Sequence, residues 1–137
     1  MRYILDTDVI SQLTKEHPRP GVVEWVVSQD ESDLFLSVAT LLEIRYGIEK
    51  KTRGRKRDEL EDWLTNKLPQ RFEERIVPIE LHVADLAARI LYRSEKQNWG
   101  MDEMDAIIGA SAMANDMGLA TLNWKPFEAL GLDLAEF

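Results

Sequence analysis

Short apolar runs separated by longer segments with helical periodicity form the main pattern of this chain. Residues 3–5, 34–36 and 76–77 are uninterrupted apolar runs, and such runs are typical of short strands that are buried on both faces. Residues 119–122 form a similar run near the end of the sequence. Strands that alternate with helices predict a mostly parallel central sheet covered on both faces, which is an α/β/α sandwich.

The segments between these runs carry apolar residues at helical spacing. We expect helices over residues 9–13, 22–27, 38–48, 60–68, 80–96 and 104–117. The fourth of these helices is predicted to stop before Pro69, because proline disfavours a helical conformation in the residue that precedes it. Gly118 is predicted to end the last helix, because glycine readily adopts the left-handed conformation found after helix C-termini.

Size and composition indicate an ordinary globular protein. The 137 residues are enough to bury a core, and we expect a single domain over residues 1–137. No apolar run approaches the roughly 20 residues that a membrane-spanning helix needs. The absence of cysteine excludes disulfides and thiolate-bound zinc. The first apolar run reaches Asp6 too early for a signal peptide, so we expect a cytoplasmic protein.

Three acidic residues far apart in the sequence each stand where a predicted strand or loop passes into a helix, namely Asp6, Glu43 and Asp105. Because parallel strands direct their carboxyl ends to the same edge of a sheet, we expect these side chains to converge there. Converging carboxylates repel one another, and oxygen ligands of this kind favour Mg²⁺ or Mn²⁺. The pattern therefore predicts a metal-dependent site that cleaves phosphodiester bonds.

Each of these acids also has a purely structural alternative. Asp6 is placed to cap the helix that follows it, and Glu43 matches a capping box with Thr40. Asp105 lies in the first turn of its helix, where acids interact favourably with the helix dipole. However, Asp105 is the polar position next to an otherwise apolar segment, residues 106–110, which favours a shared site over three independent caps.

Polar residues next to the three acids are candidates for supporting roles. Thr7, Thr121 and Asn123 are placed to position a phosphate group or a water molecule. Asp8 and Asp102 are either additional acids of the site or ordinary acids at helix N-termini.

The net charge of −8 weighs against a nucleic-acid partner, but the charge is unevenly distributed. Six of the eight residues from 50 to 57 are basic, namely Lys50, Lys51, Arg53, Arg55, Lys56 and Arg57. These residues, together with Arg45, are candidates for binding along an RNA backbone. The alternative is a solvated helix end whose cations pair with the acids of residues 58–62. Trp124, beside the last predicted strand, is the tryptophan best placed to stack on a base.

Four segments resemble, in order, the motifs of PIN-domain nucleases. They are YILDTDVIS at residues 3–11, SVATLLEIRYGI at 37–48, DAIIGASA at 105–112 and LATLNWKPF at 119–127. Each motif is short, but four in the same order are specific, and together they extend over the length of the chain. Within the family, the sequence most resembles the VapC/FitB toxins of bacterial toxin–antitoxin pairs.

The resemblance implies an α/β/α sandwich and a metal-dependent endoribonuclease. It implies that Asp6, Glu43 and Asp105 bind Mg²⁺ or Mn²⁺ and hold the activated water that hydrolyses RNA. It also implies a partner antitoxin, often a DNA-binding repressor as well. The expected assembly is a homodimer or a toxin–antitoxin hetero-oligomer.

Three positions depart from the family pattern and leave two alternatives open. Asp8 stands where the family usually has asparagine, and Asn123 and Pro126 stand where many relatives have a fourth acid. One alternative is a haloacid-dehalogenase-like phosphatase with Asp6 as nucleophile and Asp8 as acid/base, although the late pair of acids of those enzymes is missing. The other is a PIN module that has lost catalysis and only binds partners.

Overall fold

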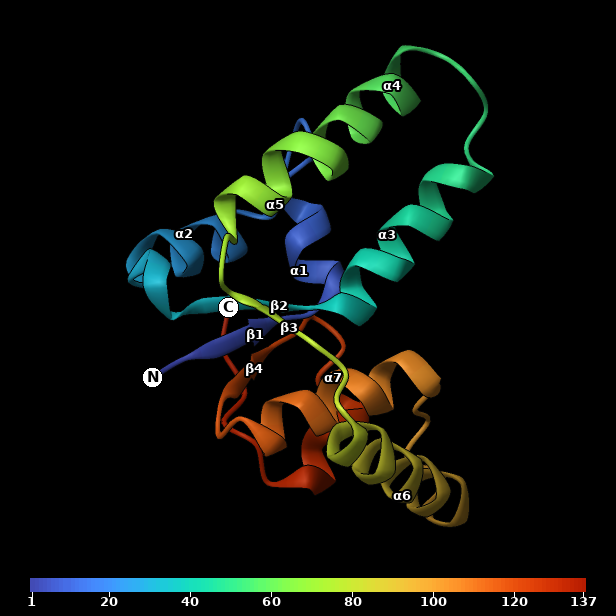
Figure 1. The fold of residues 1–137 in the computed structure, drawn as a ribbon. Coiled ribbons are helices and arrows are strands. Elements are labelled where there is room, and N and C mark those ends of the chain that lie inside the picture. The colour runs from blue at the N-terminus through green and yellow to red at the C-terminus, as the bar shows by residue number, and fades with distance from the viewer.

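The computed structural model describes all 137 residues and contains a four-stranded parallel sheet (Figure 1). The strands are β1 (Tyr3–Leu5), β2 (Leu34–Ser37), β3 (Ile76–Val77) and β4 (Gly118–Ala120). Their order is β3-β2-β1-β4, so the first strand lies between the second and the last. The predicted parallel sheet is therefore confirmed.

Helices cover both faces of the sheet, which confirms the α/β/α sandwich (Figure 1). One side carries α1 (Thr7–Gln12), α2 (Pro20–Ser28), α3 (Val38–Lys50), α4 (Arg55–Asp62) and α5 (Leu68–Arg71), and the other carries α6 (Leu81–Gln97) and α7 (Glu103–Ala114). Two 3-10 helices, η1 (Glu31–Asp33) and η3 (Lys125–Leu130), and one π-helix, η2 (Trp63–Lys67), complete the list. None of the helices combines the length and the apolar character that crossing a membrane requires.

The alternation of side chains along the strands divides the core into two clusters. Leu34 and Leu36 join Leu5 in the cluster beneath α1 to α5. Phe35 and Ile4 belong to the cluster beneath α6 and α7. Successive strand residues point to opposite faces, and both faces are covered, so each short strand must be apolar throughout. This explains why the strands appear in the sequence as continuous apolar runs.

The helix that was predicted to stop before Pro69 continues through it, so that prediction was wrong. Helix α4 leads into η2, in which the Leu68 N–H bonds to the Trp63 carbonyl five residues earlier. Helix α5 then extends to Arg71. Pro69 lies in the first turn of α5, where its missing N–H leaves no bond unmade. The π-turn before it changes the hydrogen-bond pairing at the point where a regular α-helix would clash with the ring.

Gly118 does not end α7 but begins β4, so this expectation was also wrong. Helix α7 ends at Ala114, and Asp116, with a φ of 52°, adopts the left-handed conformation that was expected of the glycine. A Cβ atom on Gly118 would lie 2.6 Å from the Tyr3 ring and 2.9 Å from the Asp133 carbonyl oxygen. The glycine therefore permits the close packing of β4 beside β1.

The carboxyl ends of β1, β2 and β4 lie at one edge of the sheet, because the strands are parallel. Asp6 follows β1, Ser37 ends β2 and Thr121 follows β4. Two helices also begin here, since Asp6 is the N-cap of α1 and Ser37 is the N-cap of α3. This edge is where open α/β sheets build their sites.

Candidate active site

Asp6 is the one buried carboxylate of the chain, with 6% of its surface exposed. Its Oδ1 accepts a hydrogen bond from the Thr7 N–H at 2.7 Å, and its Oδ2 accepts one from the Thr121 hydroxyl at 2.8 Å. Burial, followed by repulsion from Asp8, raises its pKa from 3.8 to about 7, and Asp105 adds to the increase. Asp6 thus caps α1 as the structural alternative predicted, and it also carries a charge that no protein cation balances.

Asp8 joins α1 to the loop that follows β4. Its carboxylate accepts hydrogen bonds from the Leu122 N–H at 3.1 Å and from the Asn123 N–H at 3.2 Å. Burial raises its pKa, while these backbone bonds oppose the increase. Asp8 is therefore more than an ordinary acid of a helix N-terminus, because it fixes the last motif segment beside the first.

Glu43 lies in the second turn of α3 and does not form the capping box predicted with Thr40. Ser37 caps α3 instead, by accepting the Ala39 N–H at 3.1 Å, which shifts the helix start three residues earlier than the capping-box reading required. The Oε1 atom of Glu43 accepts a hydrogen bond from the Thr7 hydroxyl at 2.7 Å. Thr7 therefore connects Glu43 to Asp6, since its N–H and its hydroxyl bind the two carboxylates.

Asp105 belongs to a capping box with Asp102 at the start of α7. The Asp105 N–H donates to Asp102 Oδ1 at 2.8 Å, and the Asp102 N–H donates to Asp105 Oδ2 at 3.2 Å. Burial raises the pKa of Asp105 to about 6, with further increases from Asp102 and Glu43. The structural alternative for Asp105 is confirmed, yet the side chain also lies within electrostatic reach of Glu43 and Asp6.

The four acids lie near one another without surrounding a common point. Repulsion from Asp8 and Asp105 acts on Asp6, and repulsion from Glu43 acts on Asp105. No three Asp, Glu or His side chains are close enough together to hold one metal ion. The structure thus brings Asp6, Glu43 and Asp105 to the same edge, and their role as joint metal ligands stays a prediction.

The chemistry of this edge fits a hard divalent cation. Its side-chain donors are all oxygens, from carboxylates and from the hydroxyls of Thr7 and Thr121. None of the four acids takes part in an ion pair with lysine or arginine. A cation such as Mg²⁺ or Mn²⁺ prefers oxygen ligands and would offset the repulsion that raises the pKa of Asp6.

The basic residues of the α3–α4 region divide into paired and unpaired groups. Three arginines form ion pairs with nearby acids: Arg45 with Glu61, Arg55 with Glu59 at 3.1 Å, and Arg57 with Glu49 at 3.4 Å. The ammonium group of Lys50 lies over the Tyr46 ring. The alternative that the basic stretch pairs with the acids of residues 58–62 therefore holds for Arg55, whereas Arg57 pairs with Glu49 and Arg45 lies outside the stretch.

Lys51 and Lys56 lie instead in a groove of about 320 Å³ between α1, α3 and α4. Neither lysine forms an ion pair. Lys15, just beyond α1, lines the same groove, which extends to Thr7 and Glu43. No sequence pattern singles out Lys15, because it stands alone among polar residues and lies near the other lysines only in the folded chain.

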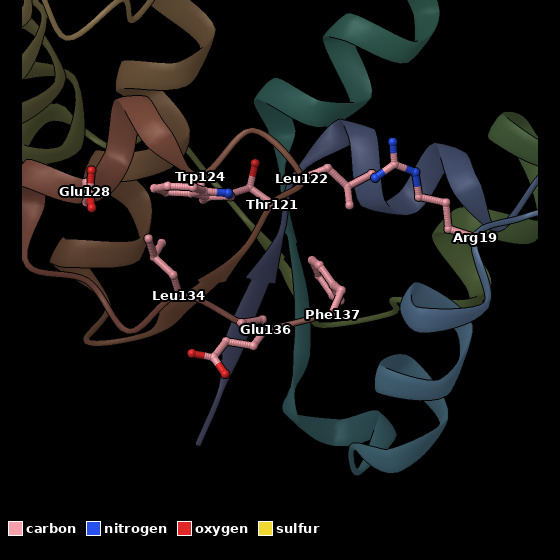
Figure 2. Close-up of a pocket in the computed structure, with 9 residues that line it drawn as sticks. Arg19, Thr121, Leu122, Trp124, Glu128, Leu134, Glu136 and Phe137 are labelled. Atoms are coloured by element: carbon pink, nitrogen blue, oxygen red, sulfur yellow. The ribbon is translucent and has the colours of Figure 1, made fainter.

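A second pocket, of about 480 Å³, opens on the other side of Thr121 (Figure 2). Its walls include Leu122 and Trp124 after β4 and residues 134–137 at the end of the chain. Trp124 is 51% exposed, whereas the other three tryptophans are at least partly buried. The two pockets thus flank the acids, one reached through Thr7 and the other through Thr121.

Comparison with known proteins relates the chain to one family over most of its length. A sequence model of the PIN domain matches residues 3–131. Plasmid stability protein StbB of Pseudomonas syringae pv. tomato is 33% identical over 131 residues, which are 96% of this chain and 94% of that protein. VapC ribonuclease Y4jK of Sinorhizobium fredii is 30% identical with the same coverage, and toxin FitB of Neisseria gonorrhoeae is 31% identical over 98% of this chain and 95% of that protein.

Solved structures show the same similarity. FitAcB from Neisseria gonorrhoeae superposes with a TM-score of 0.88 at 28% identity, over 98% of this chain and 96% of that chain. FitAB bound to a DNA fragment gives the same TM-score and identity, over 97% and 93% of the two chains.

Proposed function

This chain belongs to the PIN-domain family, and on that basis we propose that it is a metal-dependent endoribonuclease serving as the toxin of a toxin–antitoxin pair. The observation that carries this proposal is the buried, unbalanced carboxylate of Asp6, coupled through Thr7 to Glu43 and by charge to Asp105. The names of two relatives, a VapC ribonuclease and a toxin, support the activity and the biological role.

We propose that Asp6, Asp105 and Glu43 hold the divalent cation, which is Mg²⁺ or Mn²⁺. When bound, such a cation makes a coordinated water more acidic and stabilises the charge that develops on phosphate during hydrolysis. The hydrogen bonds of the acids support this assignment, because each acid is oriented by a neighbour and still keeps lone pairs free.

The supporting residues act as positioning groups in this proposal. Thr121 orients Asp6 by donating its hydroxyl proton, and Asp102 orients Asp105 through the capping box. Asp8 takes the N–H groups of Leu122 and Asn123, which holds the loop after β4 at the edge of the site. The exposed side chain of Asn123 is then available to the scissile phosphate or to the attacking water.

We propose that RNA approaches along the groove of Lys15, Lys51 and Lys56. Unpaired ammonium groups that lead toward Glu43 suit a row of backbone phosphates. The paired guanidinium groups of Arg45 and Arg55 are less available, because binding phosphate would compete with existing carboxylate partners. Of the basic stretch that was expected to contact RNA, Lys51 and Lys56 are the residues that line this groove.

Residues 1–137 form one nuclease domain in this proposal, since both core clusters pack on a single sheet. The partner is an antitoxin, in a homodimer of toxins or a toxin–antitoxin hetero-oligomer, and the site of action is the cytoplasm, where RNA is found. Two solved relatives, FitAcB and FitAB bound to a DNA fragment, support the proposed protein partner.

Cleavage assays on matched variants test the proposed function. Wild type, Asp6→Asn and Asp105→Asn are incubated with total cellular RNA in Mg²⁺ or Mn²⁺ and in chelator, and new 5′ ends are mapped. Loss of a metal ligand removes several kcal/mol of transition-state stabilisation, so we expect cleavage to fall by about a thousand-fold or more. Asp85→Asn is the control, because Asp85 is a surface acid that pairs with Arg89 on α6.

Cleavage by Asp6→Asn at the wild-type rate, or undiminished cleavage in chelator, would contradict the proposal. A folded wild type that cuts no RNA but binds an antitoxin would favour the alternative of a PIN module without catalysis. The phosphatase alternative belongs to a different fold family, whereas the PIN-domain model matches residues 3–131 of this chain. We therefore do not retain it.

A further inference from the structure

We propose that the pocket beside Trp124 receives one base of the RNA strand next to the scissile phosphate. This inference rests on the proposed ribonuclease activity and adds a recognition subsite to it. The occupant is a single-stranded nucleobase, because such bases are recognised by stacking on aromatic side chains and by hydrogen bonds to their edges.

The pocket shares its wall with the acids. Thr121 lines the pocket, and its hydroxyl also donates to Asp6 at 2.8 Å. The next residue, Leu122, lines the pocket too, while its N–H donates to Asp8 at 3.1 Å. A strand whose phosphate lies at the acids therefore has the pocket nearby, separated from the acids by the wall that Thr121 and Leu122 form.

The walls of the pocket suit a flat aromatic ligand. Figure 2 shows Trp124 and Leu134 on one side of the opening and Phe137 on the other. Trp124 has 51% of its surface exposed, and its indole forms no aromatic pair with another ring. At about 480 Å³ the pocket lies in the range of small-ligand sites and accommodates a base with part of its ribose.

Charged side chains also line the pocket. Glu128 and Glu136 supply carboxylate acceptors, and Arg19 supplies guanidinium donors (Figure 2). None of these three residues forms an ion pair, so their hydrogen-bonding capacity is free. The mixture of acceptors and donors matches the mixed edge of a base better than it matches a phosphate or a simple cation.

A cationic side chain of a protein partner is the competing occupant, since an indole next to two carboxylates also suits arginine. The hydrogen bond from Thr121 to Asp6 favours RNA, because it places the pocket next to the proposed site of cleavage. The experiment below separates the two occupants.

Binding measured without cleavage tests the inference. Asp105→Asn protein is titrated with a labelled single-stranded RNA that contains a mapped cut site, in Mg²⁺, with and without the added changes Trp124→Leu and Trp124→Phe. Stacking on an aromatic side chain contributes about 1–3 kcal/mol per base, so Trp124→Leu should weaken binding roughly 5- to 100-fold. Trp124→Phe should retain most of the affinity, because the ring is kept.

Tyr92→Leu is the matched control, because Tyr92 is an exposed aromatic residue on α6, away from the pocket, and its loss should leave the affinity unchanged. RNA should also quench the tryptophan fluorescence of the Asp105→Asn protein, and this quenching should be lost in both Trp124 variants. Thermal unfolding of each variant verifies that the fold is intact, and Trp124→Phe provides the answer if Trp124→Leu fails to fold.

Each other outcome overturns a different claim. If the wild-type protein cuts no RNA, so that no cut site can be mapped, the proposed ribonuclease function fails together with the subsite. Equal RNA binding with and without Trp124 overturns the subsite alone and leaves the ribonuclease intact. If Trp124→Leu binds RNA normally but loses a co-purified protein partner, the pocket belongs to that partner, and the inference is wrong.

Discussion

The acid edge and the α3–α4 hairpin are both densely charged, yet their charges behave in opposite ways. We use acid edge for Asp6, Asp8, Glu43 and Asp105, and hairpin for residues 45–61. At the acid edge, burial and mutual repulsion raise the pKa of Asp6 to about 7. On the hairpin, the hydrogen bond from Arg45 lowers the pKa of Glu61. At the acid edge the charges repel one another, whereas on the hairpin Arg45, Arg55 and Arg57 are paired with acids.

This difference indicates which charged residues of the chain are available to bind a ligand. A cluster of paired surface charges contributes little to stability and leaves little electrostatic potential for a ligand. A buried carboxylate without a paired cation lowers the stability of the fold. Its presence in the folded protein indicates a ligand that compensates the charge. The hairpin is conspicuous in the sequence, but the single Asp6 is chemically the more informative feature.

The pH dependence of stability gives the largest predicted contrast. The folded-state pKa of Asp6, about 7, lies above its ordinary value of 3.8. As pH rises, the unfolded chain therefore releases the Asp6 proton at a lower pH than the folded protein does. The metal-free protein therefore loses stability as pH rises from about 4 to 7, and the ionised Asp6 costs up to about 4 kcal/mol at pH 8. In chelator, we expect Asp6→Asn to raise the unfolding temperature at pH 8 more than at pH 5.

Addition of Mg²⁺ or Mn²⁺ at pH 8 then completes this test. Wild type should regain unfolding temperature, because a cation binds the folded state and not the unfolded one, and Asp6→Asn should gain less. If the unfolding temperatures of both proteins depend on pH in the same way in chelator and respond equally to metal, the ionised Asp6 does not destabilise the metal-free fold.

The positioning of Asp6 predicts the next effect. Thr121→Val removes the hydroxyl that donates to Asp6 Oδ2 at 2.8 Å while keeping the size of the side chain. Loss of such an outer contact to a metal ligand costs about 10- to 100-fold in metal affinity or activity. Thr121→Ser keeps the hydroxyl and should retain near-wild-type cleavage. Equal cleavage by the Val and Ser variants would show that Asp6 needs no orientation.

Much of the fold was predictable because apolar periodicity directly reflects burial. The strands at residues 3–5 and 76–77 match the observed bounds, since a strand buried on both faces leaves a continuous apolar run. The π-turn before Pro69 was not predictable, because its hydrogen bonds depend on how α4 and α5 pack on the core. The role of Gly118 likewise depends on the Tyr3 ring, 115 positions away in the sequence.

The candidate site was only partly predictable, for a similar reason. Position at a strand end identified Asp6, because parallel topology brings such residues to one edge, and position at the start of a helix identified Asp105. The bond from Thr7 to Glu43 and the bonds of Asp8 to the loop after β4 join segments more than 30 residues apart, and no local pattern encodes them. Lys15 was missed because it reaches the groove only through the packing of α1 against α3.

The lysines of the groove predict a moderate effect that separates paired from unpaired charge on the hairpin. Lys51→Gln with Lys56→Gln should reduce the slope of log affinity against log salt for single-stranded RNA by about 1.4. Arg55→Gln with Arg57→Gln removes the same charge from residues that pair with Glu59 and Glu49, and should change the slope less. Binding is measured on Asp105→Asn protein. Equal changes in the two double variants would show that ion pairing does not decide which cations meet RNA.

Glu61→Gln, which breaks the ion pair with Arg45, is predicted to have the smallest effect on the unfolding temperature. The pH dependence of this effect is opposite in sign to that of Asp6→Asn. The pKa of Glu61 is lowered from 4.5 in the folded state, so the stabilisation by this pair is complete above that value and fades as pH falls below it. Both groups are exposed, so Glu61→Gln should leave the unfolding temperature at pH 8 almost unchanged. Any small loss should disappear in acid, whereas the gain from Asp6→Asn grows with pH. A large drop in the unfolding temperature of Glu61→Gln at pH 8 would mean that the exposed charges of the hairpin stabilise the fold as strongly as the acid edge destabilises it.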